Sequence, residues 1–134
     1  MVTADQLICH AIGDYVIQSD WMAGEKTRRF SVALLHAVTY ALPFLFLTHS
    51  VYALAAIVST HAVIDRWRLA RFVVFIRNGL APGMSDKRWI DFDPNTGFAR
   101  ERPVWLTTWL LIICDNVMHV LINAAAIRVA EVLS

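Results

Sequence analysis

The stretch that decides the fold, VWLTTWLLIICDNVMHVLINAAAI at Val104–Ile127, is a long apolar run that carries three polar side chains at four-residue steps. These side chains are Asp115, His119 and Asn123. Four residues turn an α-helix by about 400°, so the three groups lie on one face, about 6 Å apart along the axis. An aspartate near the centre of a membrane helix costs about 2.5 to 3.5 kcal/mol on insertion. We therefore expect Asp115 to be paired, solvated in a cavity or bound to a cation.

The composition around this stretch is typical of an integral membrane protein. The 134 residues are 57% hydrophobic and 17% charged, with a net charge of +1. The apolar residues form long blocks, whereas the charged residues crowd into two loops. We predict one all-α domain, an integral membrane four-helix bundle with one long cytoplasmic loop. The expected partners are the lipid bilayer and anionic lipid headgroups, no nucleic acid is expected, and a homo-oligomer is left open.

The apolar blocks predict four helices and one long polar connection. The helices are expected at about 4–18, 30–48, 51–76 and 104–131, with the loop at 78–102. Ser19 and Asp20 are predicted N-caps, and Pro43 is expected to kink the second helix and to free the carbonyl of Thr39. The first segment is only about 22 Å long, so the sequence leaves open whether it spans fully.

The basic connections predict the topology. The connections at 19–29 and 66–102 both follow odd-numbered segments, so a four-span arrangement places them on the same side. Basic loops lie on the cytoplasmic side of bacterial membranes. We therefore expect a multi-pass protein of the bacterial inner membrane with cytoplasmic basic loops.

Histidine and aspartate recur at i and i+4 in three of the predicted helices, and the second helix adds a lone His36. Any single pair could be a hydrogen bond that holds the bundle together. The whole set instead suits a divalent ion, zinc, manganese or iron, and it is large enough for two ions bridged by a carboxylate. The candidate metal ligands are His10, Asp14, His36, His61, Asp65, Asp115 and His119, and catalytic duty is expected of Asp14, Asp65 and Asp115.

Four further residues complete the predicted site. Gln18 and Asn123 repeat the four-residue spacing and are expected to orient the ligands by hydrogen bonds. Arg68 and Lys26 are the candidate substrate-binding residues. Arg68 lies seven residues after His61 on the same helical face, where it could hold a phosphate, but it could equally anchor the helix among lipid headgroups.

Four segments carry a resemblance to a known family: HAIGDYVIQSDWMAGEK (10–26), LLHAVTY (34–40), HAVIDRWRLARFVV (61–74) and NTGFARERPVWLTTWLLIICDNVMHVLINA (95–124). They resemble domain-of-unknown-function family 3307, small membrane proteins of bacteria and their phages. The resemblance covers nearly the whole chain, and its polar marks fall on His10, Asp14, Gln18, His36, His61, Asp65, Asp115 and His119. The chain is also distantly similar to inner-membrane proteins described as metal-dependent hydrolases.

Three functions are compatible with these patterns. The first is a membrane-embedded, metal-dependent hydrolase acting on a lipid or a lipid-linked phosphate or ester, in which the metal lowers the pKa of water to about 7. The second is a proton or ion relay, or a channel component, built on the histidines and aspartates. The third is a non-catalytic structural membrane protein, for which a phage origin is left open. Bound metal would favour the first function, and conductance in liposomes would favour the second. If neither is observed, the third function is favoured.

Overall fold

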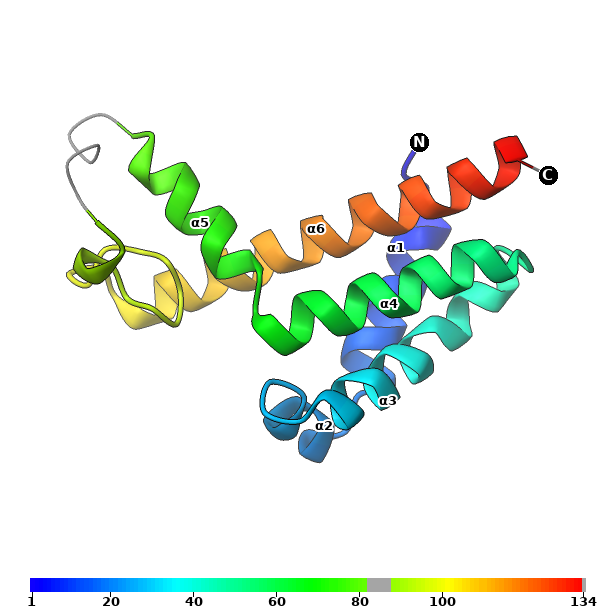
Figure 1. Ribbon diagram of the computed structural model, residues 1–134, viewed down its shortest axis with the longest axis horizontal. Helices are drawn as coiled ribbons and strands as arrows, with labels where there is room; N and C mark the ends of the chain where they lie inside the picture. The colour runs from blue at the N-terminus through cyan, green and yellow to red at the C-terminus, as the bar shows by residue number, and fades with distance from the viewer. Residues whose placement is uncertain (82–87, 134) are drawn as a thin grey trace. The chain divides into compact units, whose positions relative to one another are not determined.

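The computed structural model describes residues 1–81 and 88–133, and its regular elements are helical (Figure 1). Within these residues there is no β-strand, only an isolated antiparallel bridge between Phe92 and Ala99. The all-α class is therefore confirmed. The elements in chain order are α1 (Ala4–Ala11), η1 (Ile12–Ile17), α2 (Asp20–Glu25), α3 (Phe30–Ala41), η2 (Leu42–Phe46), α4 (Val51–Trp67), α5 (Ala70–Gly79), η3 (Trp89–Asp91) and α6 (Val104–Leu133).

The chain divides into two compact units. The first unit consists of Met1–Trp67 and His119–Ser134, and the second consists of Arg68–Met118. Helix α6, predicted at 104–131, is one continuous helix that contributes its first half to the second unit and its second half to the first.

The first predicted helix, 4–18, changes its hydrogen-bond pattern partway along. Thr3 caps α1 in a capping box, in which its hydroxyl accepts from the N–H of Gln6 and its own N–H donates to the Gln6 side chain. From Ile12 to Ile17 the chain forms a π-helix, η1. The prediction of an uninterrupted α-helix over 4–18 is therefore wrong. Ser19 caps α2, as predicted. Pi-helical turns are rare and often lie at functional sites.

Pro43 interrupts the second predicted helix. Helix α3 ends at Ala41, and η2 continues it as a tighter 3-10 helix with the proline in its first turn. Proline has no N–H to donate, which ends the regular α-helical pattern. The carbonyl of Thr39 is nevertheless not freed, because it accepts from the N–H of Leu42. The following turn leaves His49 exposed before α4 begins.

The prediction of one continuous third helix over 51–76 is wrong. Helix α4 ends at Trp67, and Arg68 adopts a left-handed conformation with φ of 52° before α5 begins. No glycine or proline marks this break, so local sequence signals do not reveal it. The helical face predicted to carry both His61 and Arg68 therefore ends at Trp67.

The second unit packs a loop against α5. The ring of Trp89 stacks on Phe72 and meets the edge of Phe75, which also contacts Phe92. Gly97 has a φ of 74°, and a Cβ there would lie 2.1 Å from the carbonyl oxygen of Arg71. Only glycine permits this approach. Most of the predicted loop at 78–102 is irregular, and its residues 82–87 lie outside the described part of the chain.

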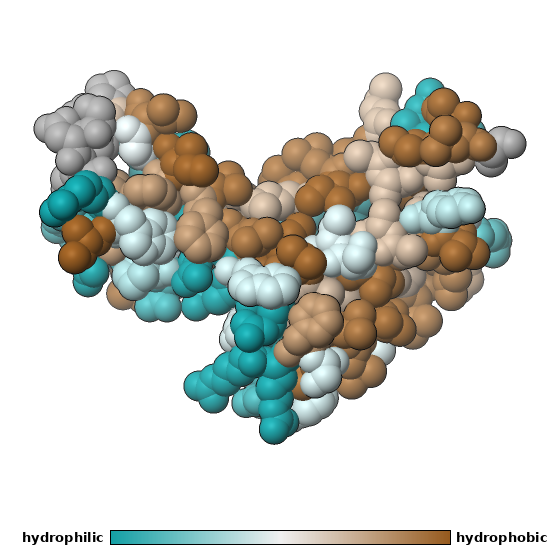
Figure 2. All heavy atoms as spheres, in the orientation of Figure 1, coloured by the Kyte–Doolittle hydropathy of each residue, from teal (hydrophilic) through white to brown (hydrophobic). Residues whose placement is uncertain are grey.

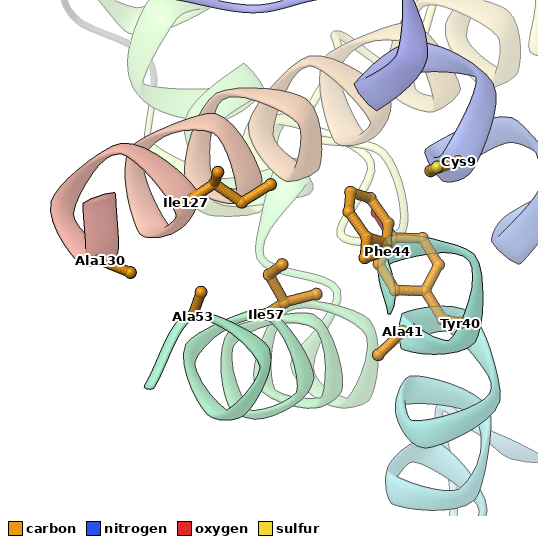
Figure 3. Close-up of a cluster of buried hydrophobic side chains, with 8 residues drawn as sticks. All are labelled: Cys9, Tyr40, Ala41, Phe44, Ala53, Ile57, Ile127 and Ala130. Carbon is orange, nitrogen blue, oxygen red and sulfur yellow. The ribbon is translucent and has the colours of Figure 1, made fainter. Parts of the chain in front are cut away.

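A small apolar cluster holds the first unit together at the end where η2 meets α4 (Figure 3). Phe44 and Ile57 are fully buried in it, and Ile127 joins them from α6. Cys9 is also part of this cluster and donates its thiol to the carbonyl of Pro43. The cysteine therefore packs as a small core residue.

One helix within the described residues, α6, is long and apolar enough to cross a membrane by length and composition. The stretch Phe30–Phe46 is apolar but shorter. A membrane span at the C-terminal end is therefore compatible with the structure, while the four-span arrangement stays a prediction. Hydrophobic residues cover much of the face of α3 and α4 seen in Figure 2, and polar residues gather near α2.

Candidate metal centre

Gly13 brings η1 against α3 and so places Asp14 inside the first unit. A Cβ on Gly13 would lie 2.5 Å from Cδ2 of Tyr40 and 2.8 Å from the carbonyl oxygen of Tyr40. No larger residue fits at this distance without moving the backbone. The close contact, together with the π-helical turn, directs Asp14 toward His36 on α3.

Four side chains from three helical segments converge at one point. Asp14 comes from η1, His36 from α3, and His61 and Asp65 from α4. One donor atom from each lies within 4.8 Å of all the others. His36 and His61 are completely buried, and the side chains of Asp65 and Asp14 are 5% and 12% exposed. We call these four residues the His–Asp cluster.

The contacts inside the His–Asp cluster have similar lengths. Asp14 Oδ1 lies 3.2 Å from His36 Nε2 and 3.4 Å from His61 Nε2. Asp65 Oδ2 lies 3.4 Å from His36 Nε2 and 3.1 Å from His61 Nε2. The two Nε2 atoms are 3.0 Å apart. Two carboxylates and two imidazoles thus direct single atoms at one small volume.

Both cluster histidines make their polar contacts through Nε2. Within the described part of the chain, Nδ1 of His36 and Nδ1 of His61 are buried and have no hydrogen-bond partner. The ring of His61 is instead held by stacking on Tyr40, with centroids 3.7 Å apart and planes at 21°. Packing, and not an acceptor at Nδ1, therefore orients this imidazole.

The remaining carboxylate oxygens face two outer histidines. Asp14 Oδ2 lies 3.4 Å from His10 Nδ1, and Asp65 Oδ1 lies 3.5 Å from His119 Nε2. Both outer histidines are buried. Each aspartate thus directs one oxygen into the His–Asp cluster and the other toward an imidazole outside it. This is the arrangement in which outer groups orient metal-binding carboxylates.

Tyr40 links this arrangement to α6. Its hydroxyl lies 2.8 Å from His10 Nδ1 and accepts a 2.6 Å hydrogen bond from Asn123 Nδ2. Tyr40 is fully buried, and Asn123 is 2% exposed. Asn123, predicted to orient a metal ligand, therefore contacts Tyr40, which in turn contacts His10 and stacks on His61.

Lys26 reaches the His–Asp cluster from the end of α2. Its Nζ lies 2.9 Å from Asp65 Oδ2, 3.3 Å from His36 Nε2 and 2.6 Å from Gln18 Oε1. Gln18, predicted to orient a metal ligand, thus accepts from this lysine. The side chain of Lys26 is 17% exposed, so it connects the buried cluster with the surface.

Two predicted site residues belong to the second unit. Asp115 is half-buried on α6, one turn before His119, and its role as a ligand stays a prediction. Arg68 donates to the side-chain and backbone oxygens of Asn95. The phosphate contact predicted for Arg68 rested on a helical face shared with His61. Because α4 ends at Trp67, that argument no longer holds.

The His–Asp cluster matches the donor set and spacing of a tetrahedral metal site. Four ligands held about 2.0 to 2.1 Å from Zn²⁺ lie about 3.3 to 3.4 Å from one another at the corners of a tetrahedron. The five distances that involve an imidazole nitrogen range from 3.0 to 3.4 Å, and the donor oxygens of the two aspartates lie within 4.8 Å of each other. Imidazole and carboxylate are also the ligands that zinc, manganese and iron accept. The residues therefore fit a single divalent ion.

Sequence reasoning missed Tyr40 and Gly13. Tyr40 follows His36 by four residues, the same interval that joins the histidine and aspartate pairs, so this spacing could have identified it. Gly13 carried no comparable signal, because its importance comes from a contact with a residue on another helix.

Comparison with known proteins gives one family and no characterised relative. The sequence matches the family described as "Protein of unknown function (DUF3307)" over residues 2–134. No curated protein and no solved structure matches the chain.

Proposed function

We propose that this chain, which belongs to the DUF3307 family of proteins of unknown function, is a membrane-embedded metalloprotein that hydrolyses a lipid or a lipid-linked phosphate or ester. The observation that carries the proposal is the His–Asp cluster, in which two carboxylates and two imidazoles face one another at 3.0 to 3.4 Å. Two largely buried carboxylates with donor oxygens within 4.8 Å of each other need positive charge to compensate them, and the single charge of Lys26 balances only one of the two.

One ion per chain is the stoichiometry that we propose. The His–Asp cluster supplies a set of four donors, whereas His119 lies outside it and contacts the second oxygen of Asp65. The spacing and the donor types favour zinc, which prefers four ligands of this kind. His10 and His119 would then hold the outer oxygens of Asp14 and Asp65 and fix the orientation of both ligands.

The distribution of side chains supports a membrane environment for the first unit. Its buried residues include His10, His36, His61, His119 and Asn123, while large apolar side chains such as Val16, Leu35, Val38 and Phe46 are exposed. Polar groups inside and apolar groups outside are expected where the surrounding medium is lipid. Helix α4, with 17 residues, is about 26 Å long and approaches the thickness of the hydrocarbon layer. We therefore propose several spans in the bacterial inner membrane.

The chemistry follows from this environment. When bound, the ion would supply Lewis acidity to activate water and to polarise an ester or phosphoryl group, for which a fifth coordination position beside the four protein donors is needed. The residues of the chain position the ion, exclude bulk water from it and place Lys26 at the exposed side of the site. The ammonium group of Lys26 is suited to stabilise negative charge that develops on the substrate.

A proton relay is the second candidate, and a separate observation favours it. The Nε2 atoms of His36 and His61 are 3.0 Å apart, and Asp65 connects them to His119. Contiguous imidazoles and carboxylates of this kind also carry protons through membrane proteins. Proton flux across liposomes that contain the metal-free protein would favour this function over hydrolysis.

Metal content tests the proposed function. We expect the full chain, purified in detergent and supplied with Zn²⁺, to retain about one ion per chain, since one set of four donors is present. His36→Ala and His61→Ala should each remove most of it, while His49→Ala, at an exposed turn, should retain it. Asp115→Asn in the same assay tests whether Asp115 is a further ligand. A wild-type protein that binds no metal would exclude the hydrolase and leave the relay or a structural role.

A further inference from the structure

Lys26 occupies the same donor atoms that the proposed metal would need. Its Nζ contacts Asp65 Oδ2 at 2.9 Å and His36 Nε2 at 3.3 Å, and both atoms belong to the His–Asp cluster. Gln18 Oε1 takes the third position at 2.6 Å. An ammonium group has three N–H donors, and three partners surround this one.

The ammonium and a metal ion cannot share these partners. An imidazole nitrogen has one lone pair, so His36 Nε2 cannot bind a metal and contact an N–H of Lys26 at the same time. Two cations held by the same oxygen of Asp65 would also repel each other strongly in a buried site. Binding of the metal therefore requires Lys26 to move away from both atoms.

The segment that carries Lys26 is able to move. Helix α2 has no buried residue, and the side chain of Lys26 is partly exposed on a flexible four-carbon stem. Segments with few buried contacts change position at low cost. The backbone after Lys26 is held by a hydrogen bond from Arg66 to the carbonyl of Thr27, which keeps the lysine close to the site.

Metal binding would also reverse the charge of the site. With neutral imidazoles, two carboxylates and one ammonium give the His–Asp cluster and Lys26 a net charge of −1. A divalent ion changes this to +1, with the displaced ammonium at the exposed side. The site then attracts an anion where it previously held its own lysine.

We propose that Lys26 is a built-in competitor of the metal, and that its displacement turns the site into a receptor for a phosphate group. The inference rests on the proposed function and assigns its substrate class, a phosphate monoester or diester. Lys26 thereby has two opposite effects, since it weakens metal binding and strengthens the binding of phosphate to the metal-loaded protein.

Lys26→Met tests both effects because it removes the charge and keeps most of the stem. Zn²⁺ titration of the full chain in neutral detergent should show about ten-fold tighter binding, as expected when one contacting cation is removed. Inorganic phosphate should bind the zinc-loaded variant about ten-fold more weakly than the zinc-loaded wild type. Arg29→Met, at an exposed position paired with Glu25, is the matched control and should change neither value.

Gln18→Met separates the two effects and serves if Lys26→Met does not fold. It removes one of the three partners of Lys26 and keeps the charge, so zinc should bind more tightly while phosphate binding is retained.

Detergent micelles that contain phosphatidic acid distinguish a lipid source of the phosphate from the free ion. Competition of this lipid with inorganic phosphate identifies the headgroup as the ligand, and lack of competition identifies soluble phosphate.

The outcomes distinguish this inference from the function on which it rests. A wild type that binds no zinc overturns the proposed function. Zinc binding that is equal or weaker in Lys26→Met overturns the competition, and phosphate binding that is unchanged in Lys26→Met overturns the phosphate site. Tighter zinc together with weaker phosphate supports both parts of the proposal.

Discussion

The interiors of the two units differ in the ionisable groups that they bury. The first unit buries four histidines, two amides and Asp65 beside its small apolar cluster, while it exposes many large apolar side chains. In the second unit, the loop on α5 buries Phe92 and Phe98, and the half-buried Arg71 donates to the backbone of the loop. The comparison separates a region stabilised by aromatic packing from one whose interior needs hydrogen bonds and charge compensation.

This difference indicates where the function lies. Aromatic packing like that of the second unit stabilises a fold without any need for charge compensation. A buried set of ionisable groups is costly in any environment of low dielectric, so it persists where paired charges or a bound ion compensate it. We therefore assign the proposed metal binding and chemistry to the first unit, and the following variants test that assignment.

The largest effect is expected from Asp65→Asn. This change keeps the volume but removes the carboxylate that contacts His36, His61 and Lys26. Zinc affinity should fall by about 100-fold or more, because a ligand matters more than the outer partners whose loss costs about 10 to 100-fold. Isothermal titration with zinc measures the affinity of this variant. Glu131→Gln, an exposed carboxylate in the same unit, should leave the affinity unchanged.

A smaller effect is expected from Gly13→Ala. The added Cβ would meet Tyr40 at 2.5 Å, so η1 must shift and carry Asp14 away from His36. We expect a loss of about 1 to 3 kcal/mol in the free energy of unfolding, typical of overpacking. Zinc affinity should fall with it. Thermal unfolding in detergent and zinc titration measure the two effects.

Two other glycines serve as controls for Gly13. A Cβ on Gly24 meets nothing within 4 Å, so Gly24→Ala in α2 should be neutral or slightly stabilising. Gly97→Ala should destabilise the second unit, because its φ is 74° and its Cβ would contact the Arg71 carbonyl. It should nevertheless leave zinc affinity unchanged. A drop in zinc affinity from Gly97→Ala would contradict the assignment of the metal to the first unit alone.

The smallest effect on zinc affinity is expected from Tyr40→Phe. The ring and its stacking on His61 remain, but the hydroxyl that contacts His10 and Asn123 is lost. Leaving buried polar groups without this partner should cost about 1 to 3 kcal/mol of stability. Zinc binding should persist with only a modest reduction. Tyr52→Phe, at an 86% exposed position, is the control, and an equal loss from both variants would mean that the Tyr40 hydroxyl contributes nothing.

Local patterns in the sequence were sufficient to predict several features of the structure. The apolar run at 104–127 predicted α6, Ser19 was recognised as a cap, and Pro43 marked the interruption after α3. The four-residue interval also placed His61 beside Asp65, because residues one helical turn apart share a face whatever surrounds the helix. These features depend on neighbours in the sequence, so the sequence alone determines them.

Other features depend on contacts between distant residues, and only the tertiary structure decided them. The break at Arg68 has no local glycine or proline, and the approach of η1 to α3 depends on Gly13 meeting Tyr40. Lys26 contacts Asp65, which lies on another helix. Helical periodicity shows which side chains share a face, but packing decides which faces meet. For this reason the sequence could only list candidate histidines and aspartates, and the structure arranged six of them, other than Asp115, as a central cluster and its outer partners.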